Sequence, residues 1–170
     1  MLSLLNTGRI ETVNLTEWLA VDHSLLVKSV FPALGIDKNV VEELVCQIHQ
    51  QKKPSTMNTI RLIGAFLAEK YANTDLYKPL FEQLSTHLSD SVRCYACYLV
   101  ALHTDTPLED KLHKLKPLVA DSHFGVREII WMALRPEMSE HLDFSIAFLS
   151  HLAESEDENI RRFSTEALRP

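Results

Sequence analysis

The sequence contains few of the residues that break helices or cross-link a chain. Its 170 residues include only 4 glycines and 3 cysteines, and aromatic residues make up 8%. So little glycine argues against a fold built from tight turns, and a hydrophobic content of 46% argues against a disordered chain. Three cysteines, an odd number, fit a reducing compartment better than a disulfide framework, so we expect a cytoplasmic protein.

Long apolar runs and chemical motifs are also missing. No apolar stretch approaches the ~20 residues of a membrane-spanning helix, and residues 1–6 lack the basic and apolar regions of a signal peptide. Cys94 and Cys97 have the spacing of a metal or redox motif, but they lie inside a predicted helix without a second cysteine pair. We therefore expect no membrane partner, no metal and no cofactor.

Positive charge is in short supply as well. The formal net charge is −6, and neither half of the chain is basic: residues 1–90 hold 8 Lys/Arg and 10 Asp/Glu, and residues 91–170 hold 9 and 13. Nucleic-acid binding depends mainly on neutralising phosphates. A DNA-binding surface on this chain must therefore be a local stripe of arginines or lysines on an acidic body.

Helical periodicity is what the sequence has in abundance. Apolar residues recur at helical spacing, as in Leu80, Leu84 and Leu88, and no stretch alternates as a strand would. Thr106-Pro107-Leu108-Glu109 predicts a capping box at one helix start. The pattern predicts an all-α fold with helices near 14–21, 23–34, 38–51, 55–72, 76–89, 91–103, 107–120, 124–134, 140–154 and 158–168.

One dipeptide recurs at a fixed interval. Val92-Arg93, Val126-Arg127 and Ile160-Arg161 are 34 residues apart, a weaker copy, Ile60-Arg61, lies 32 residues upstream, and Asp90, Asp121 and Asp157 precede the three strong copies. A period of this length is typical of stacked helical repeats. Tetratricopeptide and ankyrin patterns are absent, so we predict a right-handed α-solenoid of HEAT-like repeats. It would form one domain over residues 1–170, with an N-terminal helical cap at 1–36 and about four helix pairs at 37–170.

The third and fourth units contain the candidate site residues. If the second helix of each pair lines the concave side, Arg127, Arg161 and Arg162 project into a shared trough and contact successive phosphates. The full set of candidates is Arg127, Glu128, Trp131, Arg135, Arg161, Arg162 and Arg169. The same residues also allow a purely structural interpretation. In it, the Asp and Arg residues bond between neighbouring units and Trp131 is a core residue.

Two runs resemble a known family. DSHFGVREIIWMALRP at 121–136 is similar to a segment of the DNA alkylation repair family, the bacterial HEAT-like 3-methyladenine DNA glycosylases of AlkC and AlkD type. DENIRRFSTEALRP at 157–170 resembles a second signature of that family and is closest to the AlkC-type branch. The opening residues, LNTGRIE at 5–11 and EWLA at 17–20, are similar to the start of such proteins.

The resemblance implies a solenoid that holds alkylated double-stranded DNA and excises cationic purines such as 3-methyladenine without a metal. It implies backbone contacts from Arg127 and from Arg161 and Arg162, and it places Trp131 at an aromatic position of the AlkC-type branch. Glu128 and Trp131 are then the catalytic candidates, since a carboxylate stabilises positive charge that develops on the sugar. Glu128 departs from the AlkD-type pattern, which has a second arginine there.

A different class of function stays open. In the AlkC-type branch the Arg-Pro motif continues into further repeats, whereas this sequence ends at Pro170, as a fragment or shortened protein would. The sequence therefore leaves catalytic competence, lesion preference and oligomeric state open. The alternative is a non-catalytic HEAT-repeat scaffold that binds a protein partner in its concave groove, a use to which solenoids are suited and which the acidic balance favours.

Overall fold

A computed structural model describes residues 1–169, and this part of the chain is helical without a strand. The prediction of an all-α fold is therefore confirmed. No helix within these residues is both long and apolar enough to cross a membrane. The helices are α1 (Leu2–Leu5), α2 (Leu15–Leu19), α3 (His23–Val30), the 3-10 helix η1 (Phe31–Leu34), α4 (Lys38–His49), α5 (Thr56–Tyr71), α6 (Tyr77–Ser85), α7 (Asp90–Ala101), α8 (Leu108–Val119), α9 (Phe124–Glu140), α10 (Leu142–Leu152) and α11 (Glu158–Glu166).

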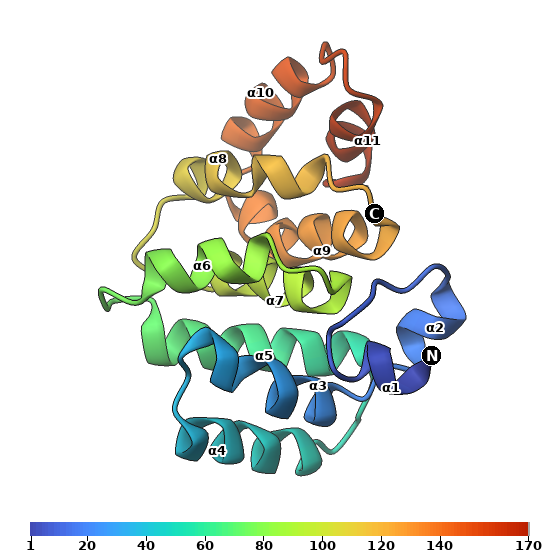
Figure 1. The fold of residues 1–170 in the computed structure, drawn as a ribbon. Coiled ribbons are helices and arrows are strands. Elements are labelled where there is room, and N and C mark those ends of the chain that lie inside the picture. The colour runs from blue at the N-terminus through green and yellow to red at the C-terminus, as the bar shows by residue number, and fades with distance from the viewer. Residues whose placement is uncertain (170) are drawn as a thin grey trace.

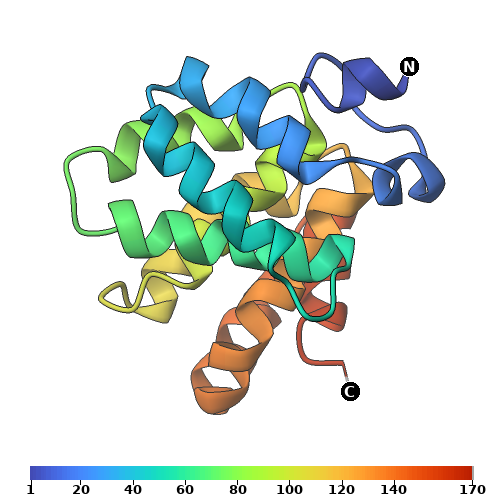
Figure 2. The ribbon, with the colours of Figure 1, turned by 90° about the horizontal axis from the view of Figure 1, so that it is seen from below.

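Helices that follow each other in the chain pack as pairs, and the pairs are layered one on another (Figure 1). The pairs are α4 with α5, α6 with α7, α8 with α9 and α10 with α11, joined by short loops. The second helices α5, α7 and α9 also pack against one another in a row. Figure 2 looks along the layers from the α4 end, with α3 and α4 nearest the viewer and the C-terminal helices behind.

α7 is the centre of the core. Each of its twelve residues is buried, because α5, α6, α8 and α9 pack around it. Small side chains such as Cys94, Ala96 and Cys97 let these neighbours come close. Burial raises the pKa of both thiols, so they stay protonated and pack as small apolar groups. The two cysteines are therefore core residues of α7.

Gly64 is the point of closest approach between α5 and α7. A Cβ atom at this position would lie 2.2 Å from the Cβ of Tyr98 and 3.1 Å from its backbone. Tyr98 lies within the central helix, so its backbone has no room to retreat. Glycine is needed here for space, and the sequence alone gave this residue no role.

Replacing Gly64 with alanine is expected to destabilise the protein by about 1–3 kcal/mol, the usual cost of overpacking a core. In an open helix the same change would stabilise by roughly 0.5–1 kcal/mol, so the sign of the effect is diagnostic. Urea unfolding followed by circular dichroism measures it. Glu69→Ala, at an exposed position of the same helix, is the control and should change stability little. A Gly64→Ala protein as stable as the parent would contradict the contact.

Several helix boundaries differ from the sequence-based prediction, and two of these differences have a clear structural cause. α9 continues past Pro136 to Glu140, because Met138 is fully buried and Glu137 pairs with Lys111 of α8, which together hold the last turn. The capping box at Thr106 does not form. The Thr106 hydroxyl bonds to the His103 ring at 2.9 Å instead, and α8 begins at Leu108. At the end of α9 a tertiary contact outweighs the local signal, and at Thr106 a different local hydrogen bond competes with the capping box.

Candidate functional site

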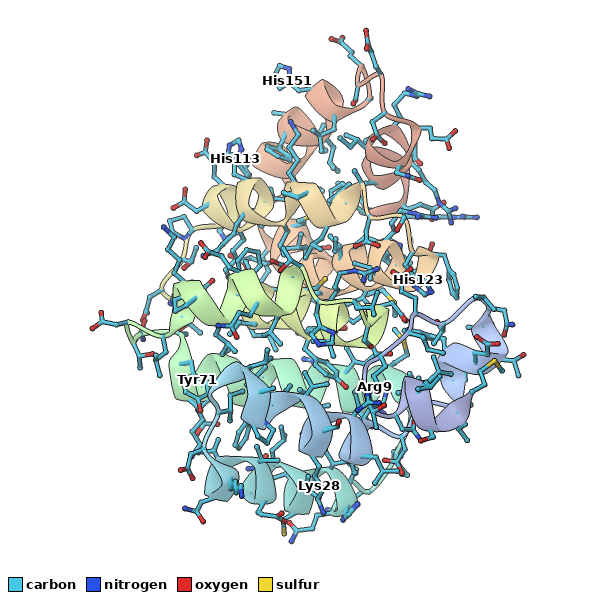
Figure 3. The ribbon with its side chains drawn as sticks, in the orientation of Figure 1. Arg9, Lys28, Tyr71, His113, His123 and His151 are labelled. Atoms are coloured by element: carbon cyan, nitrogen blue, oxygen red, sulfur yellow. The ribbon has the colours of Figure 1, made fainter. Side chains whose placement is uncertain are left out.

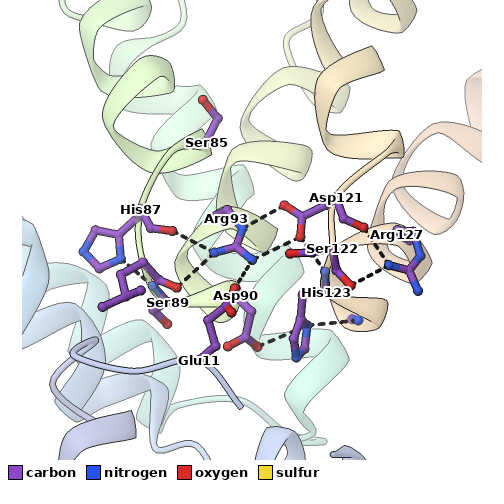
Figure 4. A network of polar contacts seen from close by, with 12 residues as sticks. Glu11, Ser85, His87, Ser89, Asp90, Arg93, Asp121, Ser122, His123 and Arg127 are labelled. Atoms are coloured by element: carbon purple, nitrogen blue, oxygen red, sulfur yellow. Dashed lines mark hydrogen bonds and ion pairs between the residues drawn. The ribbon is translucent and has the colours of Figure 1, made fainter. Parts of the chain in front are cut away.

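The arginines of the three strong dipeptides make the same pair of hydrogen bonds. In each, Nη1 donates to the carbonyl oxygens six and five residues earlier, in the loop before the arginine's own helix. The acceptors and distances are His87 (2.8 Å) and Leu88 (2.9 Å) for Arg93, Asp121 (2.6 Å) and Ser122 (2.8 Å) for Arg127, and Ser155 (2.7 Å) and Glu156 (2.8 Å) for Arg161. Figure 4 shows the first two. The 34-residue period therefore marks a repeated loop-to-helix junction.

Arg93 is also the most heavily paired cation. It is buried, and it binds Asp121 of the next unit through Nε (2.8 Å) and Nη2 (3.0 Å), with a further bond from Nη2 to Glu11 at 2.5 Å (Figure 4). Burial alone would lower the pKa of Arg93, but hydrogen bonds to Asp121 and Glu11 raise it. For Arg93 the structural interpretation, a bond between neighbouring units, is confirmed.

The three aspartates that precede the dipeptides are not equivalent. Asp121 pairs with Arg93, whereas Asp157 caps α11 by accepting from the amides of Asn159 and Ile160. Asp90 bonds instead to Thr12 in the N-terminal segment. Grouping them as one repeated feature was wrong, because their distances from the dipeptides differ and place their carboxylates in different surroundings.

Most of the candidate residues do meet on one surface. Glu128 accepts from the Trp131 indole at 3.1 Å and from Arg162 of α11 at 2.9 Å. The Arg135 guanidinium lies 4.1 Å from the centre of a Trp131 ring and donates to the carbonyls of residues 166 and 167. We call the set Arg127, Glu128, Trp131, Arg135, Arg162 and Arg169 the α9–α11 surface.

The most accessible cations of this surface are on α11 and just after it. The side chains of Arg162 and Arg169 are 57% and 69% exposed, and each has one carboxylate partner, Glu128 and Glu166 respectively. Arg161 is exposed too, but its guanidinium bonds to its own loop. Phosphate contact by these arginines stays a prediction.

The shared trough expected for Arg127, Arg161 and Arg162 is formed only in part. Arg127 and Arg162 line a common hollow with Glu128 and Trp131, but Arg161 does not. The hollow has a volume of about 10 Å³, which is no more than one water molecule needs. A flipped purine does not fit into it, so any base contact by Glu128 and Trp131 takes place at the surface.

A second polar cluster has the residue types of a catalytic triad. The amide and hydroxyl of Thr12 donate to Asp90 at 2.9 and 3.1 Å, and Nε2 of His123 lies 2.9 Å from the Thr12 carbonyl and 3.0 Å from its hydroxyl. Figure 3 places His123 where the N-terminal segment meets the start of α9. Nothing in the sequence points to this cluster, because its members lie 78 and 111 residues apart.

The geometry of this cluster assigns it a structural role. Nδ1 of His123 accepts from the Gly125 amide at 3.1 Å, so the ring proton is on Nε2 and is donated to the Thr12 carbonyl. Thr12, Asp90 and His123 are all buried, out of reach of a substrate. The cluster fastens the N-terminal segment to the first turns of α7 and α9.

Comparison with known proteins adds no identification: no family model, curated protein or solved structure matches this chain. Within residues 1–169, no group of three or more His, Cys, Asp and Glu side chains is arranged to hold a metal ion. The α9–α11 surface is the candidate site, because most of the residues chosen from the sequence lie on it.

Proposed function

We propose that this chain is a duplex-DNA-binding protein of the HEAT-like alkylation-repair type, with its helix pairs forming a right-handed solenoid. The two C-terminal runs that resemble that family support the proposal. The packing of α5, α7 and α9 in one row, with a partner helix for each, is what such a solenoid requires. The cationic alkylated purine is the substrate class that the resemblance implies.

The single observation that carries the proposal is the convergence of the candidate residues. Of the six residues of the α9–α11 surface, Glu128, Trp131, Arg135 and Arg162 are joined by direct contacts. Arg127 lines a hollow with three of them, and Arg169 pairs with Glu166, which lines the same hollow. Four of the six are arginines, and the acidic residues that contact them there are Glu128 and Glu166. The set is thus a local excess of positive charge on an acidic chain, as phosphate binding demands.

The contacts suggest how DNA would engage the surface. Arg162 is mostly exposed, so a phosphate can compete with Glu128 for its guanidinium. Moving Arg162 to the phosphate would free one oxygen of Glu128, while the other stays fixed by the Trp131 indole. A fixed carboxylate suits a cationic base because it attracts positive charge, and the Trp131 ring beside it already attracts one cation, the Arg135 guanidinium.

Replacing Arg162 and Arg169 together with glutamine is expected to weaken duplex binding about tenfold and to reduce the slope of log K against log salt by about 2. Arg161 is kept because its guanidinium fixes its own loop. Fluorescence anisotropy with a labelled 20-base-pair duplex at several salt concentrations measures both quantities.

The matched control changes the same charge at the other end of the molecule. Arg9 and Lys28 are exposed on the N-terminal segment and α3, far from α11 (Figure 3). Arg9→Gln with Lys28→Gln should leave affinity and salt slope unchanged. Equal losses of duplex affinity in the two double variants would mean that net charge alone causes the effect. That result would contradict a site on the α9–α11 surface.

A further inference from the structure

A groove lies on another face of α9, between the ends of several helices. Two hollows of about 510 and 360 Å³ share Thr104, Glu137 and His141 and therefore form one depression, which we call the α8–α9 groove. The C-terminal part of α9 forms one wall, and the loop between α7 and α8 forms the other. None of the α9–α11 surface residues lines it.

The exposed charge of the groove is mainly negative. Asp105, Glu109 and Glu140 are exposed along it, against one exposed cation, Arg61. Lys111 adds no accessible charge, because it is 3% exposed and its ammonium is 2.6 Å from Glu137. Phosphate would be repelled here, and a cationic ligand attracted.

Two features independent of those carboxylates indicate what kind of cation fits. α7 and α9 end at the groove, and the carbonyl ends of helices carry partial negative charge. The groove also contains exposed apolar side chains, with Met132 36% and Phe144 38% exposed. A small polyamine would leave these apolar groups in water, whereas a peptide that alternates basic and aliphatic residues would cover them.

We propose that the α8–α9 groove binds a basic, extended peptide segment of another protein. The carboxylates of Asp105, Glu109 and Glu140 pair with its lysines or arginines, and Met132 and Phe144 receive its aliphatic side chains. α8 begins after Pro107 without a side-chain cap. The amides of its first turn donate to the backbone carbonyls of the peptide. The binding of DNA on the α9–α11 surface is a separate activity, and the groove does not depend on it.

The test uses the full chain and a fluorescein-labelled nonapeptide in which lysine alternates with leucine. We expect saturable binding, and binding at least about tenfold weaker for the matched peptide with glutamate in place of lysine. Glu109→Gln with Glu140→Gln should raise Kd about fivefold, the effect of losing two exposed charge pairs. Both side chains are exposed, so the fold should be kept, and circular dichroism checks this.

The controls separate the groove from general charge attraction. Glu42→Gln with Glu154→Gln makes the same charge change at exposed positions outside the groove and should leave Kd unchanged. Met132→Gln should weaken binding as well, since the aliphatic contact is lost.

The proposal fails if both glutamine pairs weaken binding equally, if spermidine displaces the peptide at concentrations near the peptide's own Kd, or if sedimentation shows a second copy of this chain occupying the groove. The Arg162 and Arg169 variant should bind the peptide normally, whatever its effect on DNA.

Discussion

Replacing Arg93 with methionine is expected to lower the free energy of unfolding by about 3–5 kcal/mol, the typical cost of removing one member of a buried ion pair. Methionine preserves much of the side-chain volume but leaves the carboxylate of Asp121 buried without a cation. It also releases two loop carbonyls and Glu11. The loss arises mainly from the stranded carboxylate, since removing the two carbonyl bonds alone is far less costly.

Arg161 provides the matched control for that change. Its guanidinium donates to two loop carbonyls in the same way as Arg93, but the side chain is exposed and pairs with no carboxylate among residues 1–169. Arg161→Met should therefore cost no more than about 1 kcal/mol. Urea unfolding of the two variants separates the carbonyl bonds from the buried ion pair.

A second replacement tests the cause. Adding Asp121→Asn to Arg93→Met removes the stranded negative charge and should recover part of the lost stability, so the two changes should not add. Losses that add in full would contradict the view that Arg93 and Asp121 act as one pair. Equal costs for Arg93→Met and Arg161→Met would contradict it as well.

Acidification is expected to destabilise the protein through His23. Nδ1 of this buried histidine lies 2.6 Å from the Tyr95 hydroxyl, and its Nε2 has no hydrogen-bond partner within the described residues. Burial lowers the pKa of His23 from 6.5 to about 4, against a smaller opposite effect from Asp22. Between these two values the unfolded chain binds a proton that the folded chain does not. The free energy of unfolding therefore falls by about 3 kcal/mol in total as the pH falls from about 6.5 to 4. Above that range His23 contributes no pH dependence.

Urea unfolding at pH 7.5, 6, 5 and 4.5 measures this dependence. His23→Gln keeps a hydrogen-bonding group beside Tyr95 but cannot take up a proton, so its stability should fall less steeply between pH 6.5 and 4. His113→Gln is the control, since that ring is exposed on α8, and it should keep the slope of the parent. A His23→Gln protein with the parent's slope would assign the acid sensitivity to other groups.

The helical repeats were readable from the sequence because the forces that form them act over short distances. The predicted helices correspond to α2–α11, with η1 continuing α3, and only α1, a four-residue helix, was missed. The recurring arginine was visible because its two carbonyl acceptors lie five and six residues back in the chain. A local geometry that repeats leaves the same residue at the same place in each unit.

The site could be read from the sequence only in part. Glu128, Trp131 and Arg135 were brought together correctly because they share one face of a single helix. The orientation of the Arg127 and Arg161 guanidinium groups was missed, since the sequence does not tell whether a guanidinium turns to solvent or back to its own loop, as both of these do. The need for glycine at position 64 was likewise not visible in the sequence, because it depends on the backbone of Tyr98, which lies against it in the folded protein.

The sequence by itself determined the helical fold, the repeat period and the residues at the repeated junctions, since these depend on spacing within one or two helical turns. Only the tertiary structure decided which carboxylate meets Arg93, that Thr12 is bound to Asp90 and His123, and where the acidic groove opens. These contacts join residues up to 111 positions apart. Their energies depend on burial and on the dielectric surroundings, which no local pattern of residues encodes.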